Sequence, residues 1–135
     1  MKILLATTNI ELQKIDLFFE QMWNNEFNLD ASNQIEDYKK CDIYYISKNN
    51  EMVSIIIYSK HNNKNCIWRF GTLESHRWKW YWTALIKYVL EKYSWNFYLF
   101  SDEKQAYYYE KFWFRNTWEK FKIWNTYWIN MVLEK

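Results

Sequence analysis

The apolar residues near the start of the chain repeat with the period of a helix. They predict a helix from Ile10 to about Trp23, with N-cap candidates at 7–9 and a short strand over 2–6 before it. The apolar positions fall on one face of that helix and are Leu12, Ile15, Phe18, Phe19 and Met22. Residues 24–34 are mostly polar and predict a loop or a short helix.

The pattern then changes to that of strands. Apolar and β-branched runs cover 42–47, 52–60 and 66–73, and polar turns at 48–51 and 61–65 separate them, which predicts an antiparallel meander. Ile55–Ile57 is continuously apolar, as expected for a strand covered on both faces.

The last part of the chain alternates helices and strands. Leu85, Val89 and Tyr93 share one face of a helix over 84–93, and a strand follows at 96–100. The crossover predicts that this strand runs parallel to 66–73. A helix over 102–112, with Ser101 or Asp102 as its cap, and strands at 114–121 and 127–133 complete one α/β (α+β) domain over 1–135.

Composition narrows the function classes. Half of the chain is hydrophobic and 23% is aromatic, which predicts a folded chain rather than a disordered one. A net charge of +2 makes a nucleic-acid partner unlikely. Cys41, Cys66, His61 and His76 lack the spacing of a metal site, so we expect no metal and a reducing compartment. The sequence shows no signal peptide or apolar span, so we expect a soluble cytoplasmic protein without a membrane partner.

Residues 70–83 carry the clearest chemical signal. A strand that leads directly into a helix start directs main-chain N–H groups and the helix dipole at one point, which is a binding site for an anion. Arg77 and Lys79 add positive charge, and Thr83 adds a hydroxyl in the first turn. Such a turn ordinarily contains glycine, but here tryptophan occupies positions 78, 80 and 82.

The chain contains one glycine and ten tryptophans, whereas a typical domain has about 7% glycine. Trp95 lies where a helix C-terminal glycine belongs, and Trp118 and Trp128 lie in turns or at strand starts. We therefore hypothesise that most tryptophans occupy glycine positions; the alternative is a core that is rich in tryptophan.

Three segments resemble the GNAT superfamily of N-acetyltransferases, in its small stand-alone bacterial form. Arg77–Leu85 resembles the acetyl-CoA pyrophosphate loop, Arg/Gln-x-x-Gly-x-Gly/Ala, with tryptophan in the glycine places. Ile67–Leu73 resembles the strand before that loop, and Tyr109–Phe114 resembles the late Tyr-Glu-Lys-x-Gly-Phe motif. The likeness is strong over 67–119, whereas Phe19–Gln21 and Glu26–Asp30 only faintly match an early Glu-Gln motif.

The resemblance implies a mixed, mostly antiparallel sheet of six or seven strands that splays where the strand ending at Leu73 meets 96–100. It also implies transfer of an acetyl group from acetyl-CoA to a primary amine on a small molecule or peptide, by direct attack. Tyr109 would be the general acid and Glu74, or water, the base. Contacts to acetyl-CoA would come from Phe70, Gly71, Thr72, Arg77, Trp78, Lys79, Trp80, Tyr81, Trp82, Thr83 and Asp102.

Two other functions stay open if the tryptophans are genuine: a non-catalytic GNAT-like interaction module, and a single-stranded nucleic-acid-binding protein that stacks bases on the indoles. If instead the tryptophans stand for glycine, a different genetic code explains the pattern, because some bacteria read UGA as glycine and others as tryptophan. Family glycines coincide with Trp78, Trp80, Trp82 and Trp113; glycine is also plausible at Trp68, Trp95, Trp118 and Trp128, and less so at Trp23 and Trp124. This hypothesis predicts that changing Trp78, Trp80 and Trp82 to glycine restores acetyl-CoA binding.

Overall fold

The structure is a computed structural model that describes residues 2–23, 41–93, 96–123 and 125–134. For residues 19–23, 61, 69, 70, 74, 78, 79, 123 and 126 it describes the main chain alone. The elements in chain order are β1 (Leu4–Leu5), α1 (Asn9–Trp23), β2 (Asp42–Lys48), β3 (Glu51–His61), β4 (Lys64–Thr72), η1 (Glu74–Lys79), α3 (Tyr81–Lys92), β5 (Phe97–Asp102), η2 (Glu103–Gln105), α4 (Ala106–Glu110), β6 (Arg115–Ile123) and β7 (Thr126–Leu133). Here η marks a 3₁₀ helix.

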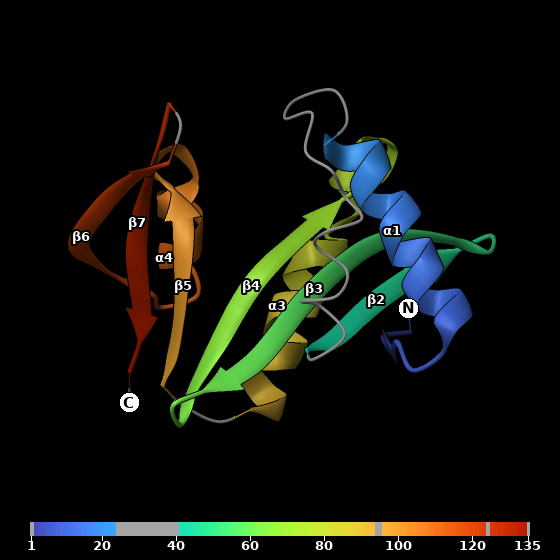
Figure 1. Ribbon diagram of the computed structural model, residues 1–135, viewed down its shortest axis with the longest axis horizontal. Helices are drawn as coiled ribbons and strands as arrows, with labels where there is room; N and C mark the ends of the chain where they lie inside the picture. Colours follow the sequence, from blue (N-terminus) through green and yellow to red (C-terminus); the bar gives the residue numbers. More distant parts are fainter. Residues whose placement is uncertain (1, 24–40, 94–95, 124, 135) are drawn as a thin grey trace.

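Seven strands form one sheet in the order β1-β2-β3-β4-β5-β7-β6 (Figure 1). The neighbours are antiparallel except β4 and β5, which are parallel. β4 and β5 pair at their first residues and then diverge along the chain, as Figure 1 shows. The predicted mixed, splayed sheet is therefore confirmed, including the two strands between which it opens.

Local sequence explains how the first strands are joined. The two hairpin turns contain Asn49–Asn50 and Asn62–Asn63, and all four asparagines have φ between 51° and 62°. Two-residue hairpin turns of type I′ need positive φ at both central residues, and asparagine tolerates this conformation better than most residues with a side chain. The turns predicted at 48–51 and 61–65 are thereby confirmed.

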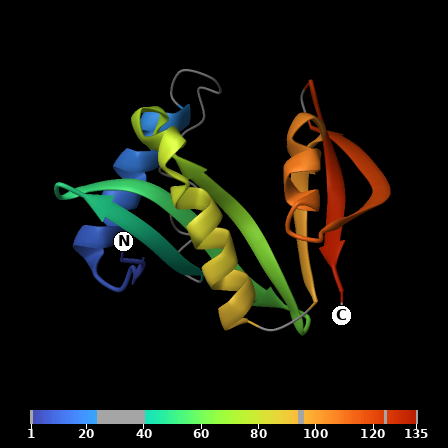
Figure 2. The same ribbon diagram turned by 180° about the vertical axis from the view of Figure 1, so that it is seen from behind.

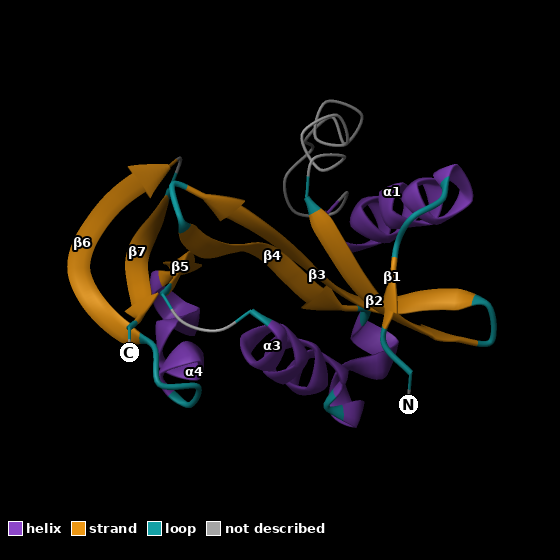
Figure 3. Ribbon diagram, turned by 90° about the horizontal axis from the view of Figure 1, so that it is seen from below, coloured by secondary structure: helices purple, strands orange, loops and turns teal. Residues whose placement is uncertain are grey.

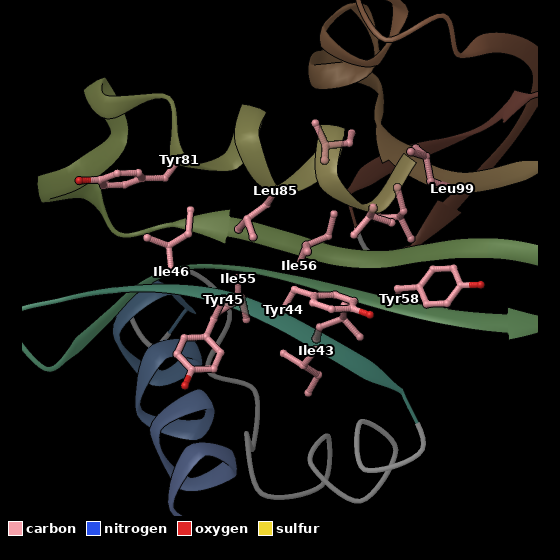
Figure 4. Close-up of a cluster of buried hydrophobic side chains, with 14 of the residues drawn as sticks. Ile43, Tyr44, Tyr45, Ile46, Ile55, Ile56, Tyr58, Tyr81, Leu85 and Leu99 are labelled. Carbon is pink, nitrogen blue, oxygen red and sulfur yellow. The ribbon is translucent and has the colours of Figure 1, made fainter. Parts of the chain in front are cut away.

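Helices cover both faces of the sheet. α1 lies against one face, whereas α3 and α4 lie against the other (Figures 2 and 3). The core between them contains Ile55–Ile57, each fully buried, as predicted for a strand covered on both sides. Leu85 of α3 and Tyr45 of β2 lie in the same cluster on opposite faces of the sheet (Figure 4).

Some predicted boundaries were wrong. The segment before α3, predicted as a turn, is the 3₁₀ helix η1, and α3 starts at Tyr81 rather than at residue 84. The helix predicted over 102–112 is the short pair η2 and α4, capped by Asp102. The first strand is only Leu4–Leu5. The predictions for 24–34 and Trp95 lie outside the described residues.

Candidate functional site

The divergence of β4 from β5 begins at a β-bulge. Ile67 is the last β4 residue paired with β5, opposite Leu99. On the other side of β4, Tyr58 pairs with Ile67 and Ile57 pairs with Arg69, so Trp68 between them is the extra residue. A bulge bends the strand that carries it. The bend therefore lies where β4 leaves β5, and it exposes the β4 main chain beyond that residue.

The C-terminal end of β4 is hydrogen-bonded to β3. Leu73 N donates to Val53 O at 2.8 Å. The buried Ser54 hydroxyl lies 2.8 Å from Thr72 Oγ1 and donates to Gly71 O at 3.1 Å. Hydrogen-bonded pairs alternate along an antiparallel ladder, so the main-chain groups of Phe70 and Thr72 face away from β3. They form an open strand edge on the side toward β5.

The open edge leads through η1 into the first turn of α3. Trp80 is both the C-cap of η1 and the N-cap of α3, in the left-handed conformation with φ 61° and ψ 20°. Its carbonyl accepts from Ala84 N at 3.2 Å, the first bond of the α3 ladder. The first N–H groups of a helix have no acceptor within the helix and carry the positive end of its dipole. The predicted positions Tyr81, Trp82 and Thr83 form this turn.

The side chains predicted to add charge or base chemistry are only partly described. Arg77 is exposed, and its Nε donates to Thr72 O at 3.3 Å, so the guanidinium lies beside the open strand edge. Glu74 starts η1 and Lys79 ends it. The side chains of Glu74 and Lys79, with those of Phe70 and Trp78, lie outside the description.

α4 brings tyrosines toward the start of α3. Tyr109 is 8% exposed and packs edge-on against Phe114 at 6.2 Å between ring centroids, and burial raises the pKa of its phenol well above the usual range. Tyr108 lies between the two helices, with its hydroxyl 3.2 Å from Thr83 Oγ1 and its ring 3.5 Å from that of Trp82. Burial raises the pKa of Tyr108 as well, and the hydrogen bond with Thr83 opposes this shift.

The hydrogen bond between the side chains of Tyr108 and Thr83 was not predicted from the sequence. The signal was the run Tyr107–Tyr109, in which only Tyr109 matched a motif. Asp102, predicted to contact the ligand, accepts from Lys104 N at 2.9 Å and caps η2 at the end of β5. Its carboxylate thus has a local structural role in this structure.

The tryptophans divide by conformation. Trp80, Trp113 and Trp118 have φ of 61°, 72° and 64°, in the region that favours glycine. Trp82 lies within α3, and Trp68 and Trp128 lie within strands, all outside that region. The backbone therefore supports a glycine position at 80, 113 and 118 and does not require one at the other three.

Comparison with solved structures shows the same arrangement of elements. An acyl-CoA N-acyltransferase from Pseudomonas aeruginosa superposes with a TM-score of 0.84 at 12% identity, over 97% of both chains. ElaA of Escherichia coli gives a TM-score of 0.81 at 18% identity, over 98% of this chain and all of the other. An aminoglycoside 6′-N-acetyltransferase in complex with coenzyme A gives 0.81 at 13%, over 99% and 97%. The chain has the GNAT fold.

Sequence comparison adds no relative to this result. No protein-family model matches the chain, and no curated protein matches it significantly. Eight solved structures that superpose on the chain are 10–18% identical to it. Among the described helices, none has the length and apolar character needed to cross a membrane.

Proposed function

We propose that this protein is an N-acetyltransferase that transfers an acetyl group from acetyl-CoA to a primary amine by direct attack. The observation that carries the proposal is the open edge at Phe70 and Thr72, which leads to the α3 N-terminus in a GNAT fold. One structure with this fold is a complex with coenzyme A. A donor with an amide-containing arm and a pyrophosphate matches these two features in order.

The main chain fits such a donor. The amides of the pantetheine arm would pair with Phe70 and Thr72 as an added strand, and the pyrophosphate would lie on the first N–H groups of α3. Arg77 is close enough to the open edge to add charge, although it now occupies Thr72 O. Trp80 directly precedes these N–H groups, and its side chain is 71% exposed.

The chemistry requires a neutral amine and a proton donor. The amine nitrogen attacks the thioester carbonyl, the C–S bond breaks, and the departing thiolate takes a proton while the new amide nitrogen loses one. Tyr109 would supply that proton, because a phenol is protonated at neutral pH. Burial raises its pKa, which holds the proton on the oxygen and makes the phenol a weaker acid than free tyrosine. Glu74 or water would accept the proton from the amine.

Binding and turnover test the proposal together. We expect calorimetry to show weak acetyl-CoA binding to the chain and tighter binding to Trp80→Gly. The sequence predicted a triple change at Trp78, Trp80 and Trp82, and we test position 80 alone. Trp78 lies within η1, and Trp82 lies within α3 and packs on Tyr108. Absence of acetyl-CoA binding in both proteins would exclude the enzyme and favour the interaction module. Salt-dependent oligonucleotide binding in its place would favour the nucleic-acid alternative.

Turnover can be followed by release of the CoA thiol in the presence of a panel of small amines and peptides. Tyr109→Phe should slow turnover at least tenfold with little change in acetyl-CoA affinity. Tyr107→Phe is the matched control, because Tyr107 is on the same helix and exposed. If Tyr109→Phe and the control turn over equally fast, another group supplies the proton.

A further inference from the structure

Eight non-glycine residues in the described part of the chain have positive φ. Five of them are asparagines, at positions 49, 50, 62, 63 and 96, and the other three are Trp80, Trp113 and Trp118. Gly71 does not have positive φ. Asparagine and glycine are the residues that ordinarily adopt positive φ. The three tryptophans therefore stand at positions where glycine would be expected.

The three indoles gain little that could offset this conformation. Trp80, Trp113 and Trp118 are 71%, 85% and 84% exposed, whereas tryptophan is on average a highly buried residue. A left-handed conformation clashes with Cβ, and asparagine relieves that cost through local hydrogen bonds that an indole cannot make. At each of the three sites, tryptophan adopts a backbone conformation that its Cβ disfavours, and its ring lies in solvent.

The three tryptophans also lie in structural settings in which glycine is common. Trp80 joins η1 to α3, Trp113 follows α4 before β6, and Trp118 lies where the register of β6 against β7 shifts. These are a helix junction, a helix C-terminal turn and a β-bulge, the three settings in which glycine is most useful.

We propose that the natural protein carries glycine at positions 80, 113 and 118, inserted at UGA codons by a cell that decodes UGA as glycine. The tryptophans then result from reading the same codons with a code in which UGA means tryptophan. Glycine at position 80 leaves only hydrogen beside the first N–H groups of α3. The inference rests on backbone conformation and side-chain exposure, so it stands whether or not the protein transfers acetyl groups.

The codons of the gene, and the masses of peptides from the protein made in its own cell, show directly which residue occupies positions 80, 113 and 118. We expect UGA at all three codons, and peptides from the native protein that are lighter at each position by the difference between the two residues. A UGG codon at any of the three positions overturns the inference there. UGA codons together with tryptophan in the native peptides overturn it entirely.

Stability measurements test the conformational argument without the native source. Gly and Ala variants at the same position both lack the indole, and only Ala keeps the Cβ that disfavours positive φ. At 80, 113 and 118 we expect urea unfolding to give a folded-to-unfolded ratio about 5- to 30-fold higher for the Gly variant than for the Ala variant. Trp128, within β7 and without positive φ, is the control at which Gly should be no more stable than Ala. Equal stability of the two variants at the three positions, or the same advantage for Gly at 128, contradicts the argument.

Discussion

The Cys66 thiol is enclosed where β4 and β5 are still paired. Cys66 is 1% exposed and lies opposite Tyr98 of β5. Burial raises the pKa of the thiol from an ordinary 9.0 to about 11. The folded protein therefore keeps the thiol protonated at pH values at which the unfolded chain releases its proton.

This shift predicts a loss of stability in alkali. The contribution is fully present below about pH 9 and declines as the pH rises toward 11, because the unfolded state binds fewer protons there. Urea unfolding of Cys66→Ala should give a lower free energy at pH 7 and a shallower decline between pH 9 and 11. Identical slopes for the two proteins would show that ionisation of Cys66 is not coupled to folding. Tyr45, whose pKa burial raises to about 12, should account for part of the slope that remains.

At the scale of elements, α1 begins with a reciprocal cap. Thr8 Oγ1 accepts from Glu11 N at 3.2 Å, and Glu11 Oε1 accepts from Thr8 N at 3.1 Å. The other oxygen of Glu11 accepts from the hydroxyl of Tyr45 on β2. One carboxylate thus closes the helix start and joins it to the sheet.

Glu11→Ala should lower the free energy of unfolding by about 1 kcal/mol through loss of the cap alone. Thermal melts should show the change, and Gln13→Ala, an exposed position on the same helix, is the control.

The Tyr45 hydrogen bond lowers the pKa of Glu11. The stabilisation is therefore present above pH 4.5 and lost as the pH falls below it, and Glu11→Gln should flatten this acid dependence. An unchanged acid slope in Glu11→Gln would contradict this role.

Local patterns predicted most elements because each buries a regular set of apolar residues. Ile55–Ile57 and the face of α3 with Leu85 and Val89 are fully buried as the spacing required. η1 was missed because a short 3₁₀ helix carries no apolar period. The placement of β7 between β5 and β6 is a long-range choice that no local pattern encodes.

The local features of the candidate site were predictable from the sequence. Residues 70–83 predicted a strand followed by a helix start, and the unusual tryptophans in this segment predicted a turn at which glycine is expected. The bulge at Trp68 could not, because one extra residue leaves the apolar pattern of β4 intact. The bond between Tyr108 and Thr83 joins two helices far apart in sequence and appears only once both are placed.

At the scale of the whole molecule, the sheet consists of two parts with a short seam. β2–β4 pair extensively with one another, as do β5–β7, whereas β4 and β5 share three residue pairs, from Asn65–Phe97 to Ile67–Leu99. Asn65 N also donates to Asn96 O at 3.0 Å beside these pairs. Figure 1 shows the two parts separating from that seam.

Amide hydrogen exchange should resolve the two parts as separate opening units. We expect β5–β7 to exchange together, at a lower opening free energy than β2 and β3. If acetyl-CoA adds a strand between β4 and β5, it slows exchange on both sides of the seam, whereas ADP, which lacks the pantetheine arm, should slow it at the start of α3 alone. Uniform exchange across the sheet would show that the seam does not divide it. If exchange instead shows two units that acetyl-CoA joins, the donor stabilises the sheet as well as reacting, because the two parts would open together only while it is bound.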